Sequence, residues 1–491
     1  MNFDQLLAKK TDFSDADASE GPRLKRTLGP WGLTALGIGA VIGGGIFVIT
    51  GQAAAEHAGP AIVLAFIMAA VCCSFTALCY AEFATLIPMA GSSYSYAYAT
   101  LGEGVAWFIG WNMVLEYGVS ASAVAVSWTG YFVSLLDHVG IHLPPALTNA
   151  PLAFTDNHLV VTGALFNLPA VAIVLALTWL CYVGIRESST VNTLMVVLKV
   201  ALIIIVIAVG WQYVNPDYWH PFIPENQGGD KYGWSGIIRG AALVFFAYIG
   251  FEATSTAAQE AKNPQRDLPI GTLASLAICT ILYIGMAVVL TGLLPFDQLG
   301  TSEPVVTAVK AHAELNWLRW VVEVGALIGL SSVILVMVIA QPRIFMIMGR
   351  DGMLPPVFAK IHPKYCTPHI NTVITGVGIA ALAAVFPLDI LGDLVSMGTL
   401  IAFTAVCLGV LILRRTRPDL PRTFRVPAAP VVCTLGVLSC LFLLIFGENW
   451  YNWTMMGVWT VIGFAIYFGY GYKHSKLRDA GGLAPARAVS R

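Results

Sequence analysis

Residues 31–57 read WGLTALGIGAVIGGGIFVITGQAAAEH, and this stretch decides the class of the fold. It has no charged residue before Glu56 and exceeds the roughly 20 residues with which a helix crosses about 30 Å of hydrocarbon. Three consecutive glycines, Gly43, Gly44 and Gly45, stand in its middle. Such a run weakens a helix and frees backbone groups, which a membrane tolerates only beside a cavity or a ligand. Glycines that serve close helix packing are spaced by four, which this run is not. The stretch therefore predicts a membrane span that is interrupted at its centre.

The rest of the chain repeats this apolar pattern. Of its 491 residues, 57% are hydrophobic and only 11% are charged, against about 25% charged residues in an ordinary soluble protein. Windows of about 19 residues place spans near 31–57, 60–88, 104–135, 167–185, 190–212, 235–258, 270–294, 319–347, 371–387, 393–413, 430–447 and 453–471. The sequence predicts an all-α integral membrane protein with 12 transmembrane helices.

The distribution of Lys and Arg predicts the orientation of these spans. An even number of spans puts both termini on one side of the membrane. If that side is the cytoplasm, it holds 22 of the 27 basic residues, and only Lys231, Arg239, Lys310 and Arg319 fall outside. Cytoplasmic loops are enriched in Lys and Arg, so we expect both termini to be cytoplasmic. The polar first 26 residues also lack the apolar core of a cleavable signal peptide.

A second span is interrupted in the same way. Residues 247–252, AYIGFE, lie in the sixth span, five spans after the interruption at residues 42–47. An odd offset makes two groups of five spans run in opposite directions, as an inverted repeat requires. The predicted organisation is an N-terminal cytoplasmic tail (1–30), a first five-helix repeat (31–212), a second, inverted repeat (235–413), helices 11 and 12 (430–471) and a C-terminal cytoplasmic tail (472–491).

The two interruptions predict a binding site for a zwitterion. The outer half of span 1 begins at the midplane, where unpaired N–H groups and the helix dipole favour a carboxylate. The outer half of span 6 ends there with unpaired carbonyls, which suit an ammonium group. Together they fit an α-amino acid. The candidate substrate-binding backbone belongs to Val41, Ile42, Gly43, Gly44, Gly45, Phe246, Ala247 and Ile249.

Four ionisable residues lie inside apolar spans, where each is costly unless it faces a polar interior. Glu116, about halfway along span 3, and Glu252, directly after the second interruption, are candidates for contacting the substrate, and a structural hydrogen-bond acceptor is the alternative. Lys199 lies roughly nine residues into span 5, too deep to reach the cytoplasm easily. It needs an internal partner and is a candidate proton carrier, with a permanently paired lysine as the alternative. Glu82, near the end of span 2, is either functional or a solvated or paired residue.

Other classes of protein find no support in the sequence. No histidine lies in the middle of a span, so any proton coupling falls to Lys199 and the carboxylates. There is no nucleophile paired with a base, no metal-ligand spacing and no phosphate-binding loop, which argues against an enzyme, an ATP-driven pump, a metal or a cofactor. A net charge of −1 without a basic stripe argues against nucleic acid. The nine cysteines, all within spans except Cys366, are expected to be free thiols.

Several motifs resemble those of the amino acid–polyamine–organocation superfamily, most closely its bacterial cationic amino acid transporter family, over nearly the whole chain. These motifs are Ile42-Gly43-Gly44-Gly45-Ile46-Phe47, Tyr80-Ala81-Glu82-Phe83 to Gly91-Ser92-Ser93-Tyr94, Gly250-Phe251-Glu252-Ala253, Lys262-Asn263-Pro264-Gln265, Gln341-Pro342-Arg343, Arg350-Asp351-Gly352, and Met397-Gly398-Thr399-Leu400 with Phe403.

The resemblance implies the leucine-transporter-like fold in a bacterial inner (plasma) membrane, with spans 1 and 6 broken and their backbone holding the substrate. It also implies that Lys199 occupies the place of a sodium ion in sodium-coupled relatives. There it would lie beside span 1 carbonyls and span 8 hydroxyls, which here belong to Ser331 and Ser332. These three residues are the candidates for proton coupling.

Two positions depart from the resembling family. Gly44 stands where relatives often have serine, threonine or alanine, and Glu252 stands where aspartate is usual. Val333 and Ile334 add apolar bulk on span 8, so the choice between cationic and neutral substrates stays open. We expect a secondary active permease that takes up an L-amino acid with a proton by alternating access. The alternatives are an amino acid or polyamine exchanger and a transport-inactive amino acid sensor. The expected partners are the amino acid, the proton and membrane lipid.

Overall fold

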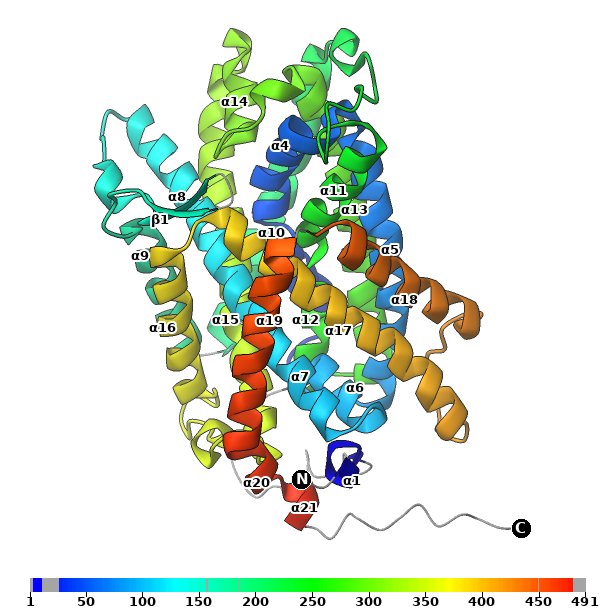
Figure 1. Cartoon of the computed structure of the whole chain (residues 1–491). Helices are drawn as coiled ribbons and strands as arrows, with labels where there is room; N and C mark the ends of the chain where they lie inside the picture. The colour runs from blue at the N-terminus through cyan, green and yellow to red at the C-terminus, as the bar shows by residue number, and fades with distance from the viewer. Residues whose placement is uncertain (1–2, 11–25, 156–157, 184, 449, 480–491) are drawn as a thin grey trace.

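Long helices that run alongside one another form the body of the molecule in the computed structural model (Figure 1). The structure describes residues 3–10, 26–155, 158–183, 185–448 and 450–479. Within these ranges the regular structure is helical except for one hairpin, in which β1 (Leu152–Thr155) pairs antiparallel with β2 (His158–Val161). The prediction of an all-α membrane protein is therefore confirmed at the level of its class.

The helix bounds follow the chain in two groups. The first group is α1 (Phe3–Leu6), α3 (Pro30–Val41), α4 (Thr50–Ala53), α5 (Ile62–Leu86), α6 (Ser92–Thr100), α7 (Glu103–Met113), α8 (Ser120–His138), α9 (Leu168–Val183) and α10 (Ile185–Gly210). The second group is α11 (Gly233–Phe245), α12 (Ala253–Thr256), α13 (Pro264–Leu293), α14 (Pro304–Lys310), α15 (Asn316–Arg350), α16 (His369–Val385), α17 (Leu388–Thr416), α18 (Ala429–Phe446), α19 (Trp450–Ile466), α20 (Tyr472–His474) and α21 (Lys476–Asp479).

The lengths of these helices suit a membrane. Among the described residues, nine helical stretches are long and apolar enough to cross one, and three shorter apolar helices accompany them: Pro30–Val41, Leu168–Val183 and His369–Val385. The stretch Gly45–Leu86 joins the outer half of the predicted span 1 to span 2. Helical residues thus occupy each predicted span, and the count of twelve crossings stays a prediction.

Polarity is distributed in the opposite sense to that of a soluble protein. Large apolar side chains face outwards, such as Trp179, Ile281 and Val461, which are 68%, 71% and 69% exposed. Some ionisable side chains face inwards instead, and Glu116 and Lys199 are fully buried. Hydrocarbon solvates the first kind and penalises the second, so this arrangement follows from a lipid environment.

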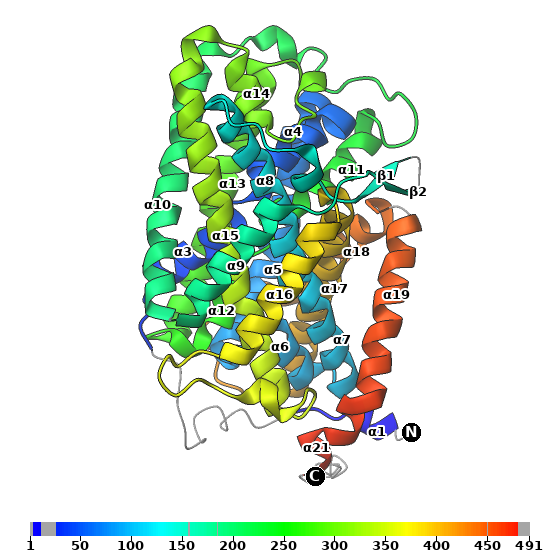
Figure 2. The same cartoon turned by 90° about the vertical axis from the view of Figure 1, so that its left-hand side faces the viewer.

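The first and last described helices lie at the same end of the molecule, and α14 lies at the other end (Figures 1 and 2). The Gln5 amide donates a hydrogen bond to the Tyr472 carbonyl at 2.9 Å, and Lys10 forms an ion pair with Asp351 at 2.6 Å. The described parts of the predicted tails are therefore docked onto the helices. Residues 1–2, 11–25 and 480–491 of those tails lie outside the described residues.

Helices from the two halves of the chain interleave around the interrupted segments. The short helix α3 packs against α13, α10 and α15, and α12 packs against α3 and α15. Both interruptions therefore lie where the two halves of the chain meet, in the buried interior.

Candidate functional site

The first interruption lies where the glycine run predicts it. Helix α3 ends at Val41, Ile42 is extended with φ −77° and ψ 101°, and a π-helical turn runs from Gly45 to Ile49. The first N–H groups of a helix have no acceptor within it, so the backbone around Gly44 offers donors to a ligand. Two of the glycines at this break also meet other chain segments too closely for a side chain.

The glycine contacts show how close those segments are. A Cβ on Gly45 would lie 2.2 Å from Cβ of Ala247, and one on Gly43 would lie 2.5 Å from Cγ2 of Val333. Real Cβ atoms do not approach other atoms so closely. The nearest atom to a Cβ on Gly44 would be Oγ of Ser127, at 3.2 Å, followed by Cβ of Ser127 at 3.7 Å and Cε1 of Phe246 at 3.9 Å. Gly43 and Gly45 are thus required by packing, and Gly44 is the most open of the three.

The second interruption has a different geometry. Helix α11 ends at Phe245, a single 3₁₀ turn covers Phe246–Tyr248, and Ile249 is extended. Gly250 follows with φ +123°, a backbone conformation that residues with side chains rarely adopt. The N–H of Gly250 donates to Oε2 of Glu252 at 3.0 Å, so this carboxylate stabilises the end of the interruption.

Tyr283 of α13 joins the two interruptions, and the sequence analysis missed it. Its hydroxyl oxygen lies 2.7 Å from the carbonyl oxygen of Val41 and 2.7 Å from that of Ala247. The Ala247 carbonyl, one of those expected to face a ligand, therefore already has a donor nearby, which it shares with the Val41 carbonyl. The only sequence signal was a tyrosine inside an apolar span, which does not specify a partner.

Lys199 of α10 ties three helices together. Its amino group donates to the carbonyl of Gly39 at 2.9 Å, to the carbonyl of Ile42 at 2.7 Å and to Oγ of Ser332 at 2.7 Å. The side chain is fully buried. Through these bonds α10 holds the carboxyl end of α3 against α15.

The two serines of the predicted coupling group are separated by the structure. Ser332 contacts Lys199, whereas Ser331 accepts a hydrogen bond from Nε1 of Trp128 at 3.1 Å and donates one to the Leu327 carbonyl at 2.7 Å. Neighbouring residues on a helix point about 100° apart, so only one of them can face the lysine. Contact with Lys199 thus assigns Ser332, and not Ser331, to the group around the amine.

Glu116 and Glu252 are neighbours in the interior. Glu116 lies in a π-helical turn, Val114–Val119, between α7 and α8. Both of its carboxylate oxygens and Oε1 of Glu252 are buried without a hydrogen-bond donor among the described residues. A buried carboxylate normally has partners, so these three oxygens point to a proton or a ligand group that completes the site.

Glu82 is a paired structural residue. Its carboxylate forms ion pairs with Arg414 and with Arg422, the latter at 3.3 Å, and accepts the backbone N–H of Val426 at 2.7 Å. These bonds attach α5 to the end of α17 and to the loop that follows it. This is the paired alternative of the two that the sequence left open.

Cysteines and other metal-ligating side chains form no centre here. All nine cysteines are free thiols. Across the described ranges, no group of three or more His, Cys, Asp or Glu side chains is arranged to hold a metal ion. The chemistry available at the interruptions is therefore that of backbone donors and acceptors, two carboxyl groups and one amine.

Comparisons with known proteins agree with a site for a small polar molecule inside a membrane protein. Residues 28–468 match the amino acid permease family. The chain is 47% identical to the branched-chain amino acid permease BcaP of Bacillus subtilis, over 93% of this chain and 95% of that protein. It is 44% identical to the methylthioribose transporter of the same organism, over 96% and 99% of the two chains.

A more distant relative comes from a plant. The vacuolar cationic amino acid transporter 4 of Arabidopsis thaliana is 38% identical over 84% of this chain and 67% of its own length. All three relatives are named as permeases or transporters, and none as an enzyme. The chain belongs to the amino acid permease family of the amino acid–polyamine–organocation superfamily and is a multi-pass membrane transporter.

Proposed function

We propose that this protein imports an L-amino acid together with a proton across the bacterial inner membrane, by alternating access. The observation that carries the proposal is the buried amino group of Lys199, which ties α3 to α15. The proposed architecture is leucine-transporter-like, with twelve membrane helices in an inverted repeat of residues 31–212 and 235–413 and two further helices at 430–471. Both termini are cytoplasmic in this proposal, in keeping with the distribution of basic residues.

The substrate's charged groups are assigned to the two interruptions. The carboxylate takes the backbone N–H groups of the Gly43–Gly45 run, where the dipole of the outer half-helix favours an anion. The amino group takes carbonyl oxygens of the Phe246–Ile249 turn. Tyr283 supports this arrangement, because its hydroxyl holds the carbonyls of Val41 and Ala247 at a constant separation.

The substrate side chain is assigned to an apolar wall. Cε1 of Phe246 lies 3.9 Å from the position of a Cβ on Gly44, and Val333 borders Gly43. Such a wall favours a neutral aliphatic side chain over a cationic one. The similarity to BcaP extends over 93% of this chain, and that relative is named a branched-chain amino acid permease, which points to the same choice.

The proton is assigned to Lys199. A charged lysine has three N–H donors, and the site holds three acceptors for them. Loss of one proton removes one of these bonds and weakens the tie between α3 and α15, which lets the inner half of the bundle open. The proton then travels inwards with the substrate.

Methylthioribose is a second candidate substrate, because a relative of that name matches 96% of this chain. Its methylthio group suits the apolar wall, and its hydroxyls can bond to the exposed backbone of the interruptions. It has no carboxylate for the N–H groups of the glycine run, however, which is why an amino acid is the first choice.

Purified protein in liposomes with an alkaline lumen tests the proposal. We expect radiolabelled leucine or valine to accumulate against its gradient without sodium, and unlabelled branched-chain amino acids to compete better than arginine or methylthioribose. Uptake that requires sodium would contradict proton symport. Uptake that appears only with amino acid inside would identify an exchanger, and binding without uptake would identify a sensor. Stronger competition by methylthioribose would transfer the assignment to that substrate.

A further inference from the structure

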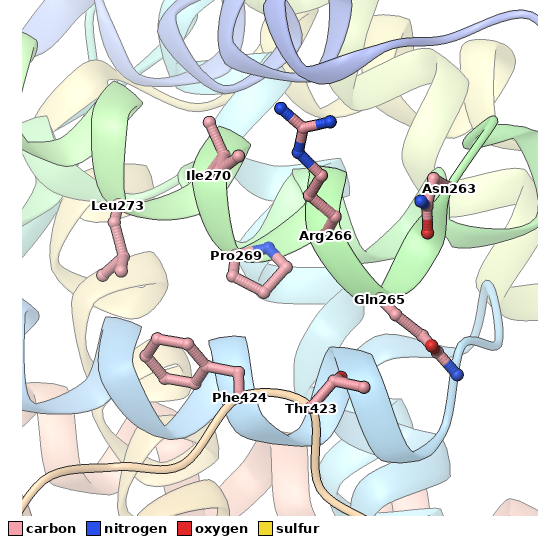
Figure 3. Close-up of a pocket in the computed structure, with 8 residues that line it drawn as sticks. All are labelled: Asn263, Gln265, Arg266, Pro269, Ile270, Leu273, Thr423 and Phe424. Atoms are coloured by element: carbon pink, nitrogen blue, oxygen red, sulfur yellow. The ribbon is translucent and has the colours of Figure 1, made fainter.

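Two cavities follow α13 from its first turn to its middle. One, of about 460 Å³, lies between the start of α13 and the loop after α17. In Figure 3, Pro269 of the helix faces Phe424 and Thr423 of that loop. The other, of about 530 Å³, lies between α5 and α13 and reaches Ile284. Leu273 lines both cavities, which adjoin at this residue and are together called the groove.

The polarity of this groove changes along its length. The first cavity has amide and hydroxyl groups on its wall, from Asn263, Gln265 and Thr423. Beyond Leu273 the wall is aliphatic. Its two hydroxyl residues, Ser74 and Thr280, each donate to a carbonyl of their own helix and offer no free donor. One end of the groove is therefore polar and the other suits a hydrocarbon chain.

The groove also has the right position relative to a membrane. Helix α13 has 30 residues and is thus about 45 Å long, whereas the hydrocarbon layer is about 30 Å thick. Its first turns must project into the headgroup region. The distance from Leu273 to Ile284 is about 16 Å along the helix, which lies within the hydrocarbon. Ile281, which borders this part, is 71% exposed and therefore faces lipid.

Unpaired cations surround the polar end. Arg266 lines the cavity, and Lys262 and Arg425 are sequence neighbours of lining residues; all three are exposed. None of the three side chains has a hydrogen-bond or ion-pair partner among the described residues, in contrast to Arg414 and Arg422, which bind Glu82. In Figure 3 the Arg266 guanidinium lies on the side of the helix away from Phe424.

The nearby acidic groups do not cancel this charge. Asp267 is buried and accepts the backbone N–H of Asn263, and Glu260 is paired with Arg343 at 2.6 Å. The segment 414–426, from the end of α17 into the loop after it, contains five arginines and a single acidic residue, Asp419, and two of these arginines, Arg414 and Arg422, bind Glu82. The rim of the polar end is therefore a region of net positive charge next to an apolar channel.

We propose that this groove binds an anionic phospholipid, with the phosphate at the rim formed by Lys262, Arg266 and Arg425 and one acyl chain lying past Leu273 between α5 and α13. Basic pockets beside membrane helices attract anionic headgroups in this manner. Since α13 packs directly against α3, the bound lipid supports the helix that carries the first interruption. In the proposed orientation the lipid belongs to the cytoplasmic leaflet.

Native mass spectrometry of the full chain in detergent tests the site, with phosphatidylglycerol and phosphatidylcholine of identical acyl chains as probes. We expect the wild type to retain phosphatidylglycerol preferentially. Each cation near a membrane surface contributes roughly a fivefold factor in affinity, so Arg266→Gln/Arg425→Gln should lose on the order of twentyfold for phosphatidylglycerol and little for phosphatidylcholine. The matched control Lys360→Gln/Lys473→Gln removes two exposed cations elsewhere and should keep the preference.

Two further measurements decide which part of the lipid is recognised. Leu273→Trp fills the junction of the cavities and should abolish retention of the long-chain lipid. Millimolar inorganic phosphate should not displace phosphatidylglycerol. Displacement by phosphate would show a free-anion site, and equal retention of both lipids, or equal losses in both double variants, would overturn the proposal. The double variants alter exposed side chains only, so the test stands even if Leu273→Trp fails to fold.

Discussion

At the scale of single residues, the amino group of Lys199 has three hydrogen-bond partners in the interior. Three acceptors surround it at 2.7 to 2.9 Å, and two of them are carbonyls at the end of α3. Because the lysine holds the end of α3 through its N–H donors, loss of a proton from the amino group weakens this attachment. In the proposed function, this makes Lys199 the residue at which a proton gradient acts on the shape of the site.

Replacement of Lys199 by methionine should separate binding from coupling. Methionine has a similar length but cannot donate or titrate, so the variant should bind leucine within about threefold of the wild type while pH-driven accumulation falls by about tenfold or more. Equilibrium binding and uptake into liposomes with an alkaline lumen measure the two quantities. Accumulation at the wild-type level would refute the coupling role.

The two serines on α15 provide a matched control for this prediction. Ser332→Ala removes an acceptor from Lys199 and should shift the pH dependence of uptake, whereas Ser331→Ala removes only the partner of Trp128 and should leave it unchanged. Equal effects of the two changes would show that general packing of α15, and not the lysine, is responsible.

At the scale of elements, the two interruptions form one unit. Gly45 of the first interruption lies so close to Ala247 of the second that a methyl group on Gly45 would not fit between them. The Tyr283 hydroxyl lies within hydrogen-bond distance of one carbonyl from each interruption, those of Val41 and Ala247. Neither interruption could keep this geometry alone, because an isolated break would leave backbone groups unpaired in hydrocarbon. The site is therefore a property of the contact between the halves of the chain.

Alanine at Gly44 and at Gly45 should consequently have different effects. At Gly45 the new Cβ would lie 2.2 Å from Cβ of Ala247, and overpacking of this kind costs about 1–3 kcal/mol. We expect Gly45→Ala to lower the thermal midpoint and to weaken leucine binding about tenfold or more. The Cβ of Gly44→Ala would have Oγ of Ser127, at 3.2 Å, as its nearest neighbour, so this variant should bind leucine within about threefold of the wild type. Thermal unfolding and equilibrium binding check both, and equal losses would contradict the close approach at Gly45.

At the scale of the whole molecule, the ends of the chain lie together. Helices α1 and α21 share one end (Figures 1 and 2), and Gln5, Tyr98, Tyr467 and Ser475 all donate to the buried carboxylate of Glu103 there. A carboxylate with several donors is well satisfied, so this cluster holds both docked termini on the bundle. The docked N-terminal and C-terminal segments therefore lie on the same side of the membrane.

The single accessible thiol can identify that side. Cys366, in the loop between α15 and α16, is partly exposed, whereas the other eight cysteines are buried. A membrane-impermeant maleimide should label one site per chain in inside-out vesicles and none in intact cells, and Cys366→Ser should abolish the labelling. Adducts formed from outside intact cells would reverse the proposed orientation.

The sequence by itself determined the membrane class, the positions of both interruptions and the depth of Lys199, because hydrocarbon penalises glycine runs and charges wherever they stand, whatever their partners. It placed Glu116 and Glu252 inside without telling which donors they would meet. Only the tertiary structure decided that Ser332 rather than Ser331 faces the lysine, that Tyr283 bridges Val41 and Ala247, and that Glu82 binds Arg414, 332 positions away. Such pairings depend on the rotation and approach of helices far apart in the chain, which packing sets and local composition does not.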